Sequence, residues 1–251
     1  MLIGMRNAML AGSGSQPSGG YWGLCFTAEQ ANSTVRIWKS GKPSSKTILY
    51  STDAVNWSAY TIGTDIVLEN VGDKVWMKAG EGGNSGGWFT TVTAYYRFKM
   101  TGLIAASGNL MSIVDGETET FTAKSFRSLF QGCTSLTTAP ALPATTLANY
   151  CYSQMFSGCT SLTATPLLPA TSLPTQCYYA MFQGCTSLAT VRTAQTQAWG
   201  DGTSDDPSQI WLEDVAATGT FYCPTALGTN ATITRGVSAC PEGWTVINTD
   251  A

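Results

Sequence analysis

The chain contains no histidine and is poor in charge. Of its 251 residues, 12% are Asp, Glu, Lys or Arg, about half the share found in ordinary soluble domains. The absence of histidine excludes Ser-His-Asp and Cys-His catalysis and every metal centre that needs an imidazole ligand. A glycosidase needs only a pair of carboxylates, so this reaction class stays open on composition alone. We find no catalytic constellation in the sequence and expect a non-enzymatic protein without a cofactor.

The few charges are unevenly distributed along the chain. No charged residue occurs between Ser128 and Val191, so that segment must present a neutral polar surface. The net charge is −3, whereas nucleic acids and anionic membranes bind basic surfaces that replace their counterions. No apolar run reaches the roughly 20 residues that span a bilayer. We therefore expect neither nucleic acid nor a membrane as a partner.

The first 20 residues have the composition of an arm rather than of a folded segment. Arg6 lies inside the apolar stretch of residues 1–10 instead of before it, which is the wrong order for a secretory signal peptide. Residues 11–20 are rich in Gly and Ser, as flexible linkers are. We expect no cleaved export signal, and an anchoring arm over residues 1–20 that docks on another subunit.

Residues 21–116 carry the pattern of an antiparallel β domain. Short alternating apolar runs are separated by turn residues, and a small β-sandwich closes such strands by burying one face of each. The segment from Ser51 to Trp57 is expected to be a hairpin turn. The expected strands are Thr34–Trp38, Thr47–Tyr50, Ile66–Glu69, Lys74–Lys78, Phe89–Met100 and Leu110–Val114.

Residues 117–251 are organised by an internal repeat. The sequence Gly-Cys-Thr-Ser-Leu occurs three times, at Gly132–Leu136, Gly158–Leu162 and Gly184–Leu188, with a spacing of 26 residues. A constant period in this range predicts a solenoid, in which each unit buries its apolar face by stacking on its neighbours. The outer two units deviate from the middle one, as capping units do. We expect about three units followed by a C-terminal cap.

Side-chain spacing within a unit predicts a short helix followed by an extended segment. In the second unit, apolar residues from Leu147 to Cys159 recur at i, i+4, i+5, i+8, i+9 and i+12, the positions of one helical face. Gly158 would cap this helix, and Pro166 and Pro169 require extended chain after it. The predicted repeat core comprises Cys133, Cys151, Tyr152, Met155, Phe156, Cys159, Cys177, Tyr178, Met181, Phe182 and Cys185.

Five of the eight cysteines belong to this core, which favours buried thiols over disulfides. Equivalent residues of stacked units point inward together, and free cysteine is among the most buried residue types. Cys223 and Cys240 flank a loop and are the best candidates for a disulfide pair. Zinc is not expected, because the chain has no histidine and no Cys-x-x-Cys. Asp201, Asp205 and Asp206 form a weak Ca²⁺ candidate in a turn-rich loop, where solvated acids are the default interpretation.

Candidate contact residues lie at positions that vary between units or beside core positions. Tyr150, Tyr179 and Trp199 carry aromatic rings that either stack on sugars or cover the edge of the solenoid. Gln131 and Gln183 occupy a variable position just before the repeated glycine. We expect host contacts, if the repeats make them, at these five residues or in the flanking loops.

The repeat also resembles a known family. Met155–Leu162, followed by Leu168–Thr171, resembles the BspA-type leucine-rich repeats of bacterial surface proteins, and in particular the 26-residue surface-protein repeat of gut bacteria and their tailed phages. The segment from Trp211 to Val246 is similar to the usual terminus of that family. The front half resembles the β domain that often precedes such repeats. The resemblance covers roughly residues 22–250 and implies extracellular attachment through protein or glycan contacts, without enzymatic activity.

Together, the patterns and the resemblance predict an α+β, β-rich fold. An arm over residues 1–20 precedes an N-terminal antiparallel β-sandwich over residues 21–116. A short leucine-rich-repeat solenoid of about three units with a C-terminal cap then fills residues 117–251.

The resulting hypothesis is a phage virion protein, such as a tail or head fibre or appendage. Its arm would bind other virion proteins, and its repeats would contact a glycan or protein on the host surface. The alternative is a secreted bacterial cell-surface adhesin, and a glycan-processing enzyme is the weakest hypothesis. Fibre proteins are often trimers, so we expect a homo-oligomer, with a trimer as the first candidate.

Overall fold

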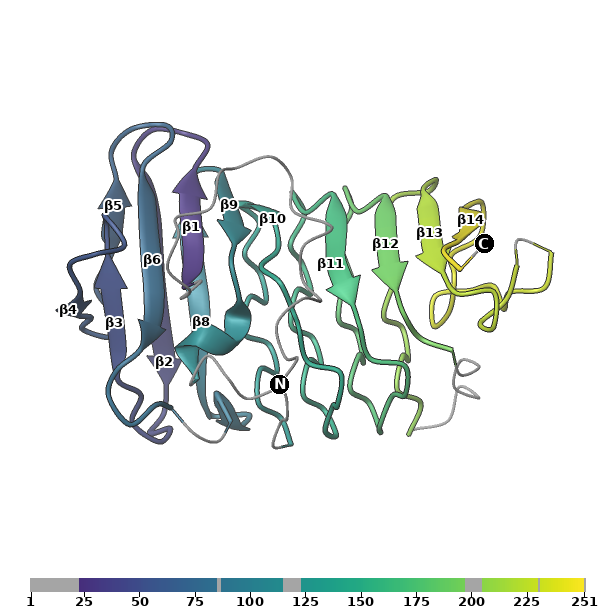
Figure 1. Cartoon of the computed structure of the whole chain (residues 1–251), viewed down its shortest axis with the longest axis horizontal. Helices are drawn as coiled ribbons and strands as arrows, with labels where there is room; N and C mark the ends of the chain where they lie inside the picture. The colour runs from purple at the N-terminus through teal and green to yellow at the C-terminus, as the bar shows by residue number, and fades with distance from the viewer. Residues whose placement is uncertain (1–22, 85–86, 115–122, 197–204, 230, 251) are drawn as a thin grey trace, which may run out of the picture.

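The protein is β-rich. The structure, a computed structural model, describes residues 23–84, 87–114, 123–196, 205–229 and 231–250, so the predicted arm lies outside the described residues. Within the described ranges the strands form three sheets, and the only helix is the short 3-10 segment η1 (Leu110–Ile113). Figure 1 shows an elongated molecule in which the strands follow one another from one end to the other.

Two of the sheets make up the N-terminal half and pack against each other, as expected for a sandwich (Figure 1). Phe26 of one sheet and Phe98 of the other lie with their ring centroids 5.0 Å apart in the common core. The first sheet has the strand order β10 (Leu136–Thr138), β9 (Ile104–Ser107), β1 (Leu24–Ala28), β6 (Lys74–Ala79), β3 (Ile48–Ser51) and β4 (Ser58–Ala59). The second has the order β5 (Ile66–Leu68), β2 (Ser33–Ser40), β8 (Ala94–Thr101) and β7 (Phe89–Thr91).

The predicted strands of this half are mostly present, with differences at two places. β2, β3, β5 and β6 coincide with predicted strands, the run Phe89–Met100 is the hairpin of β7 and β8, and the turn after Ser51 joins β3 to β4. The strand expected at Leu110–Val114 is wrong, because Asn109 accepts a hydrogen bond from the amide of Met111 and starts η1 there. β1 and β9 escape prediction. Nearly every residue of β1 is buried, so its sequence shows no alternation of apolar and polar residues.

The third sheet is formed by the repeats and the segment that follows them. Its parallel strands are β11 (Ala164–Leu168), β12 (Thr190–Thr193), β13 (Thr220–Cys223) and β14 (Thr245–Asn248), side by side in chain order (Figure 1). β13 and β14 lie after the last Gly-Cys-Thr-Ser-Leu motif. The segment predicted as a cap therefore adds two further strands to the same sheet.

The segments predicted as helices are stacked turns. We call residues 123–133, 149–159, 175–185 and 205–214 the turn layer. In the second unit, the amides of odd-numbered residues from Cys151 to Cys159 donate to the carbonyl three residues earlier, at 3.0–3.2 Å. The amides of even-numbered residues from Tyr150 to Gly158 donate to carbonyls of the next unit, at 2.7–3.1 Å. The helix prediction is wrong, because an α-helix bonds within itself and leaves no interior amide for a neighbour.

The backbone conformation of the turn layer repeats every four residues. Tyr150, Gln154 and Gly158 have positive φ angles of 62°, 57° and 76°. An α-helix would rotate side chains spaced by four residues by about 40° at each step, whereas the turn layer keeps them on one side. The left-handed conformation costs a residue with a Cβ about 1–2 kcal/mol. We infer that the lateral hydrogen bonds offset this cost.

The repeats share one continuous core with the two packed sheets. β10 of the first unit pairs in parallel with β9. The turn layer likewise continues the second sheet, because the amide of Phe98 donates to the carbonyl of Leu129 at 2.7 Å and that of Trp88 to Ser125 at 2.6 Å. Both layers of the N-terminal half thus extend into the repeats, and the buried side chains form a single cluster.

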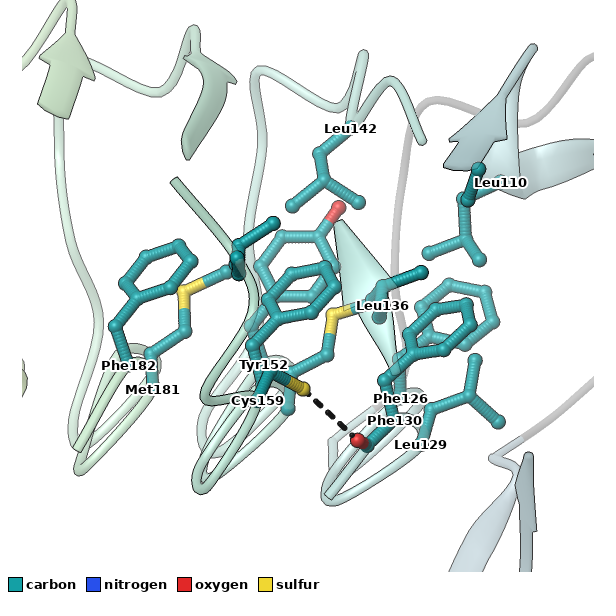
Figure 2. Packing of buried hydrophobic residues seen from close by; sticks show 14 of the residues in the cluster. Leu110, Phe126, Leu129, Phe130, Leu136, Leu142, Tyr152, Cys159, Met181 and Phe182 are labelled. Carbon is teal, nitrogen blue, oxygen red and sulfur yellow. Dashed lines mark hydrogen bonds between the residues drawn. The ribbon is translucent and has the colours of Figure 1, made fainter. Parts of the chain in front are cut away.

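Aromatic rings stack along this core (Figure 2). Phe98, Phe130, Phe156 and Phe182 form one stack, with successive centroids 4.9, 5.4 and 5.4 Å apart and interplanar angles of 8° or less. Phe126, Tyr152 and Tyr178 form a second, with centroids 6.3 Å apart. Trp211 ends both stacks: its ring lies 5.9 Å from Tyr178 and meets Phe182 edge-on at 6.4 Å. The eleven residues of the predicted repeat core are all buried.

Replacing Phe156 by Ala should lower the free energy of unfolding by about 3–5 kcal/mol, because its ring stacks between Phe130 and Phe182. Val71→Ala is the control, since Val71 is 67% exposed, and should change stability by less than about 0.5 kcal/mol. Urea denaturation followed by circular dichroism measures both. One core predicts one transition; two separate transitions, of which Phe156→Ala moves only one, would contradict the continuity of the core.

Candidate functional site

The outer face of the parallel sheet carries a row of side chains that point away from the core. Strand register places Leu167 beside Arg192, Arg192 beside Tyr222, and Tyr222 beside Ile247. Leu167 and Ile247 are 49% and 44% exposed. The guanidinium of Arg192 lies 4.1 Å from the ring centroid of Tyr222, which holds both side chains on the sheet. We call these four residues the outer row.

Alternation along the strands explains this arrangement. Val191, Phe221 and Val246 are buried on the inner face, and successive residues of a strand point to opposite faces. The outer row therefore points away from the core and, among the described residues, toward solvent. A second row lies two positions earlier and consists of Thr190, Thr220 and Thr245.

The two rows bring four kinds of contact group together on one face. A tyrosine can anchor a protein interface, and its hydroxyl can hydrogen-bond a sugar. Arginine offers a planar fork of donors to a carboxylate or carbonyl, and threonine hydroxyls donate or accept. Leu167 and Ile247 add apolar area at both ends of the row. This arrangement suits recognition of a macromolecule.

The contact residues predicted from sequence lie on the other layer. Tyr150 and Tyr179 are partly exposed on the turn layer, and Lys124 Nζ lies 5.9 Å from the ring centroid of Tyr150. The two tyrosines occupy different columns. At the 26-residue spacing the residue equivalent to Tyr150 is Gln176, and the amide of Tyr179 donates to the carbonyl of Gln176 within the same turn segment. The structure does not bring them together. Trp199 lies outside the described residues.

Gln131 and Gln183 share one column of the turn layer. The amides of Gly132 and Gly158 donate to the carbonyls of Ser157 and Gln183, which places the three residues before the repeated glycines in line. Gln183 Nε2 also donates to Glu213 Oε2. Both glutamines are partly exposed, so this column stays a predicted contact surface.

The acidic loop residues do not form a metal site within the described residues. Asp206 is buried, and its Oδ1 accepts hydrogen bonds from the amide and hydroxyl of Ser208 at 2.9 and 3.2 Å. Asp205 is exposed, and Asp201 lies outside the described residues. In the described ranges no group of three or more His, Cys, Asp or Glu side chains could hold a metal ion. The Asp206 carboxylate thus stabilises the turn that precedes Trp211.

The cysteines of the Gly-Cys-Thr-Ser-Leu motif, Cys133, Cys159 and Cys185, donate hydrogen bonds through their thiols, and we call these three thiols the thiol ladder. Figure 2 shows the bond from Cys159 Sγ to the carbonyl of Phe130, at 3.2 Å. Burial raises the pKa of Cys133 and Cys185 to about 12, and a thiol that stays protonated at neutral pH is a poor nucleophile. The ladder is therefore structural. Its other two bonds run from Cys133 to Phe98, at 3.3 Å, and from Cys185 to Phe156, at 3.1 Å.

Cys223 and Cys240, the best candidates for a disulfide pair, are not bonded to each other, since all eight cysteines are free. Cys223 Sγ lies 3.7 Å from the carbonyl oxygen of Gly228, and Cys240 Sγ accepts a hydrogen bond from Arg235 Nη1 at 3.2 Å. Burial raises the pKa of both thiols to about 11. Each thiol thus has a partner of its own near the C-terminus.

A cavity of about 330 Å³ lies beside β3, β4 and β5 and is lined by Tyr50, Tyr60 and Asp65, among others. Two of its polar groups, those of Tyr60 and Asp65, already have partners. The Tyr60 hydroxyl donates to the carbonyl of Thr64 at 2.5 Å, and the Asp65 carboxylate lies 3.4 Å from Arg36 Nε. The cavity is a weaker candidate than the outer row.

The outer row escapes sequence prediction because its period is irregular. Thr190, Thr220 and Thr245 each precede a buried apolar residue and then an outer-row residue, which is a recognisable pattern. Their spacings, 30 and 25 residues, differ from the 26 of the motif. The pattern becomes visible only once the strands are aligned.

Comparisons with known proteins add no assignment. The chain matches no family model, no curated protein and no solved structure. Across the described residues, none of the helices has the length and apolar character needed to cross a membrane. The resemblance to BspA-type repeats therefore stays a prediction.

The thiol ladder predicts a loss of stability at alkaline pH. Burial raises the folded-state pKa of Cys133 and Cys185 from 9.0 to about 12. Below pH 9 both states keep the thiols protonated, so their contribution is fully present. Between pH 9 and 12 only the unfolded chain ionises, and each thiol lowers the free energy of unfolding by about 1.4 kcal/mol per pH unit.

Urea denaturation of the wild type and of Cys133→Ala/Cys185→Ala at several pH values measures this effect. The slope of stability against pH above 9 should be shallower in the variant, because two titrating thiols are gone. Equal slopes would show that the two thiols ionise alike in both states.

Proposed function

We propose that the protein is a non-enzymatic attachment protein whose repeats contact a host-surface glycan or protein through the outer row. The observation that carries this proposal is the in-register row Leu167, Arg192, Tyr222 and Ile247, which the described residues leave uncovered. Apolar side chains exposed side by side with an aromatic ring and an arginine are typical of recognition surfaces.

We further propose that the repeats form a short solenoid of the leucine-rich-repeat type, with turns in place of helices. The parallel strands and the lateral bonds of the turn layer support this proposal. Solenoids present extended faces made of equivalent positions from several units. The outer row is such a set of equivalent positions.

A virion appendage, such as a tail or head fibre, is the setting we favour for this function. The support is the resemblance of the repeat to a family found in gut bacteria and their tailed phages. A secreted bacterial cell-surface adhesin is the alternative. In the virion setting, the arm of residues 1–20 binds other virion proteins and the chain forms a homo-oligomer such as a trimer. Neighbouring genes for capsid or tail proteins would favour the virion, and their absence would favour the adhesin.

Tyr222→Ala and Arg192→Ala should each weaken binding of the full-length protein to host cells or to an array of host glycans by about tenfold or more, the effect expected for aromatic and arginine anchors. Val71→Ala, an exposed change outside the outer row, should bind like the wild type. Tyr150→Ala and Tyr179→Ala test the turn layer in the same assay. If these two variants lose binding while the outer-row variants keep it, contact occurs on the opposite layer.

A further inference from the structure

The outer face of the second sheet concentrates positive charge in an acidic protein. Alternation along β2 and β8 buries Val35, Ile37, Tyr96 and Phe98 and turns the residues between them outward. Strand register sets Arg36 opposite Lys99, and Trp38 opposite Arg97. Tyr95 lies one outward position before Arg97. We call Arg36, Trp38, Tyr95, Arg97 and Lys99 the cationic face.

Two aromatic rings hold the cations of this face in place. Lys99 Nζ lies 4.5 Å from the ring centroid of Trp38, and the guanidinium of Arg97 lies 4.3 Å from that of Tyr95. The two rings meet edge-on, with centroids 5.6 Å apart. Long basic side chains lose conformational entropy when they bind a ligand. Ordering by the rings removes part of this cost before binding.

Positive charge on this face exceeds the negative charge beside it. Among the described residues, the ion pair at this face joins Arg36 Nε to the Asp65 carboxylate, at 3.4 Å. Arg127, on the adjoining turn layer, adds a like charge: burial, together with this repulsion, lowers the pKa of Arg97. Such an array of like charges, which has one carboxylate beside it among the described residues, is stabilised by an external anion.

We propose that the cationic face binds an acidic polysaccharide through the carboxylates of its sugars. Cross-strand neighbours lie roughly 5 Å apart and outward positions along a strand roughly 6.5–7 Å apart, so Arg36, Lys99 and Arg97 form a compact cluster on one face of the sheet. Guanidinium groups bind carboxylates in paired hydrogen bonds. A linear polymer with a carboxylate on successive sugars meets several of these cations at once.

The same contacts disfavour two other anionic partners. Single-stranded nucleic acid binds by stacking bases on open aromatic faces, but here Lys99 and Arg97 lie over the rings of Trp38 and Tyr95. An acidic protein segment needs apolar anchors at the centre of its interface. The neighbouring outward pair, Thr34 and Thr101, is polar, with hydroxyls 2.8 Å apart. A sugar polymer needs neither feature.

This site is separate from the outer row and goes beyond the proposed function. The outer row lies on the parallel sheet of the repeats, and the cationic face lies on β2 and β8 of the N-terminal half (Figure 1). Loss of one should leave the other intact. Tyr222→Ala should therefore bind an acidic polysaccharide as the wild type does.

Isothermal titration calorimetry of the full-length protein tests this proposal. The ligands are polygalacturonate and its methyl ester, which has the same backbone without the charges. We expect binding of the acid that weakens with added salt, and none of the ester. Arg97→Gln/Lys99→Gln should weaken binding by about tenfold or more. Lys42→Gln/Lys74→Gln, at two exposed lysines outside the face, is the control with the same net charge and should bind like the wild type.

Three results would overturn the proposal. Equal weakening in both double variants would mean attraction by overall charge rather than by this face. Tighter binding of single-stranded DNA or of poly-glutamate than of polygalacturonate, lost in Arg97→Gln/Lys99→Gln, would assign the face to nucleic acid or to protein. Equal binding of acid and ester would exclude carboxylate recognition. Thermal unfolding of each variant verifies that the fold is retained.

Discussion

Successive amides of the turn layer alternate between hydrogen bonds within a unit and hydrogen bonds to the next unit, and the stacking of the repeats depends on this alternation. One amide closes a turn within its own unit, and the next donates to the unit stacked on it. An α-helix satisfies its interior amides internally and offers a neighbour only side-chain contacts. The turn layer instead joins units through the backbone, as a sheet does. Buried backbone groups must be paired, so stacking is required for each turn segment to be satisfied.

This lateral bonding fixes the register of the side chains. Because each unit is bonded to the next at alternate residues, equivalent side chains lie directly above one another. Phe130, Phe156 and Phe182 therefore stack with nearly parallel rings. The N-terminal half supplies the first member of this stack, Phe98, and the first lateral amide donors, those of Trp88 and Phe98. Trp211 closes the other end, where its Nε1 donates to the carbonyl of Ala239 at 2.9 Å.

Sequence reasoning captures what depends on pattern and fails where backbone geometry decides. The stacking of units follows from the repeated Gly-Cys-Thr-Ser-Leu, and the positions of β2, β3, β5 and β6 follow from alternation. The turns are another matter. Cys151, Met155 and Cys159 fit a helix at four-residue spacing, and two of the left-handed positions are Tyr150 and Gln154, residues that do not favour this conformation. Only Gly158 marks it. The outer row is missed because an insertion before Trp211 changes the spacing between the strands that carry it.

The same stacking explains why the middle of the chain is free of charge. Equivalent residues of neighbouring units lie on adjacent strands or turns, about 5 Å apart, so a charged residue at a repeated position becomes a column of like charges. Such pairs are destabilising when they lie directly opposite each other. Charges can enter only where the repeat has diverged, as at Arg192 and Glu213, or outside it. Outside the repeats, on β2 and β8, Arg36 and Lys99 do stand opposite each other, and there the carboxylate of Asp65 offsets part of the repulsion by pairing with Arg36. That arrangement leaves a local excess of positive charge that the neutral repeats cannot carry.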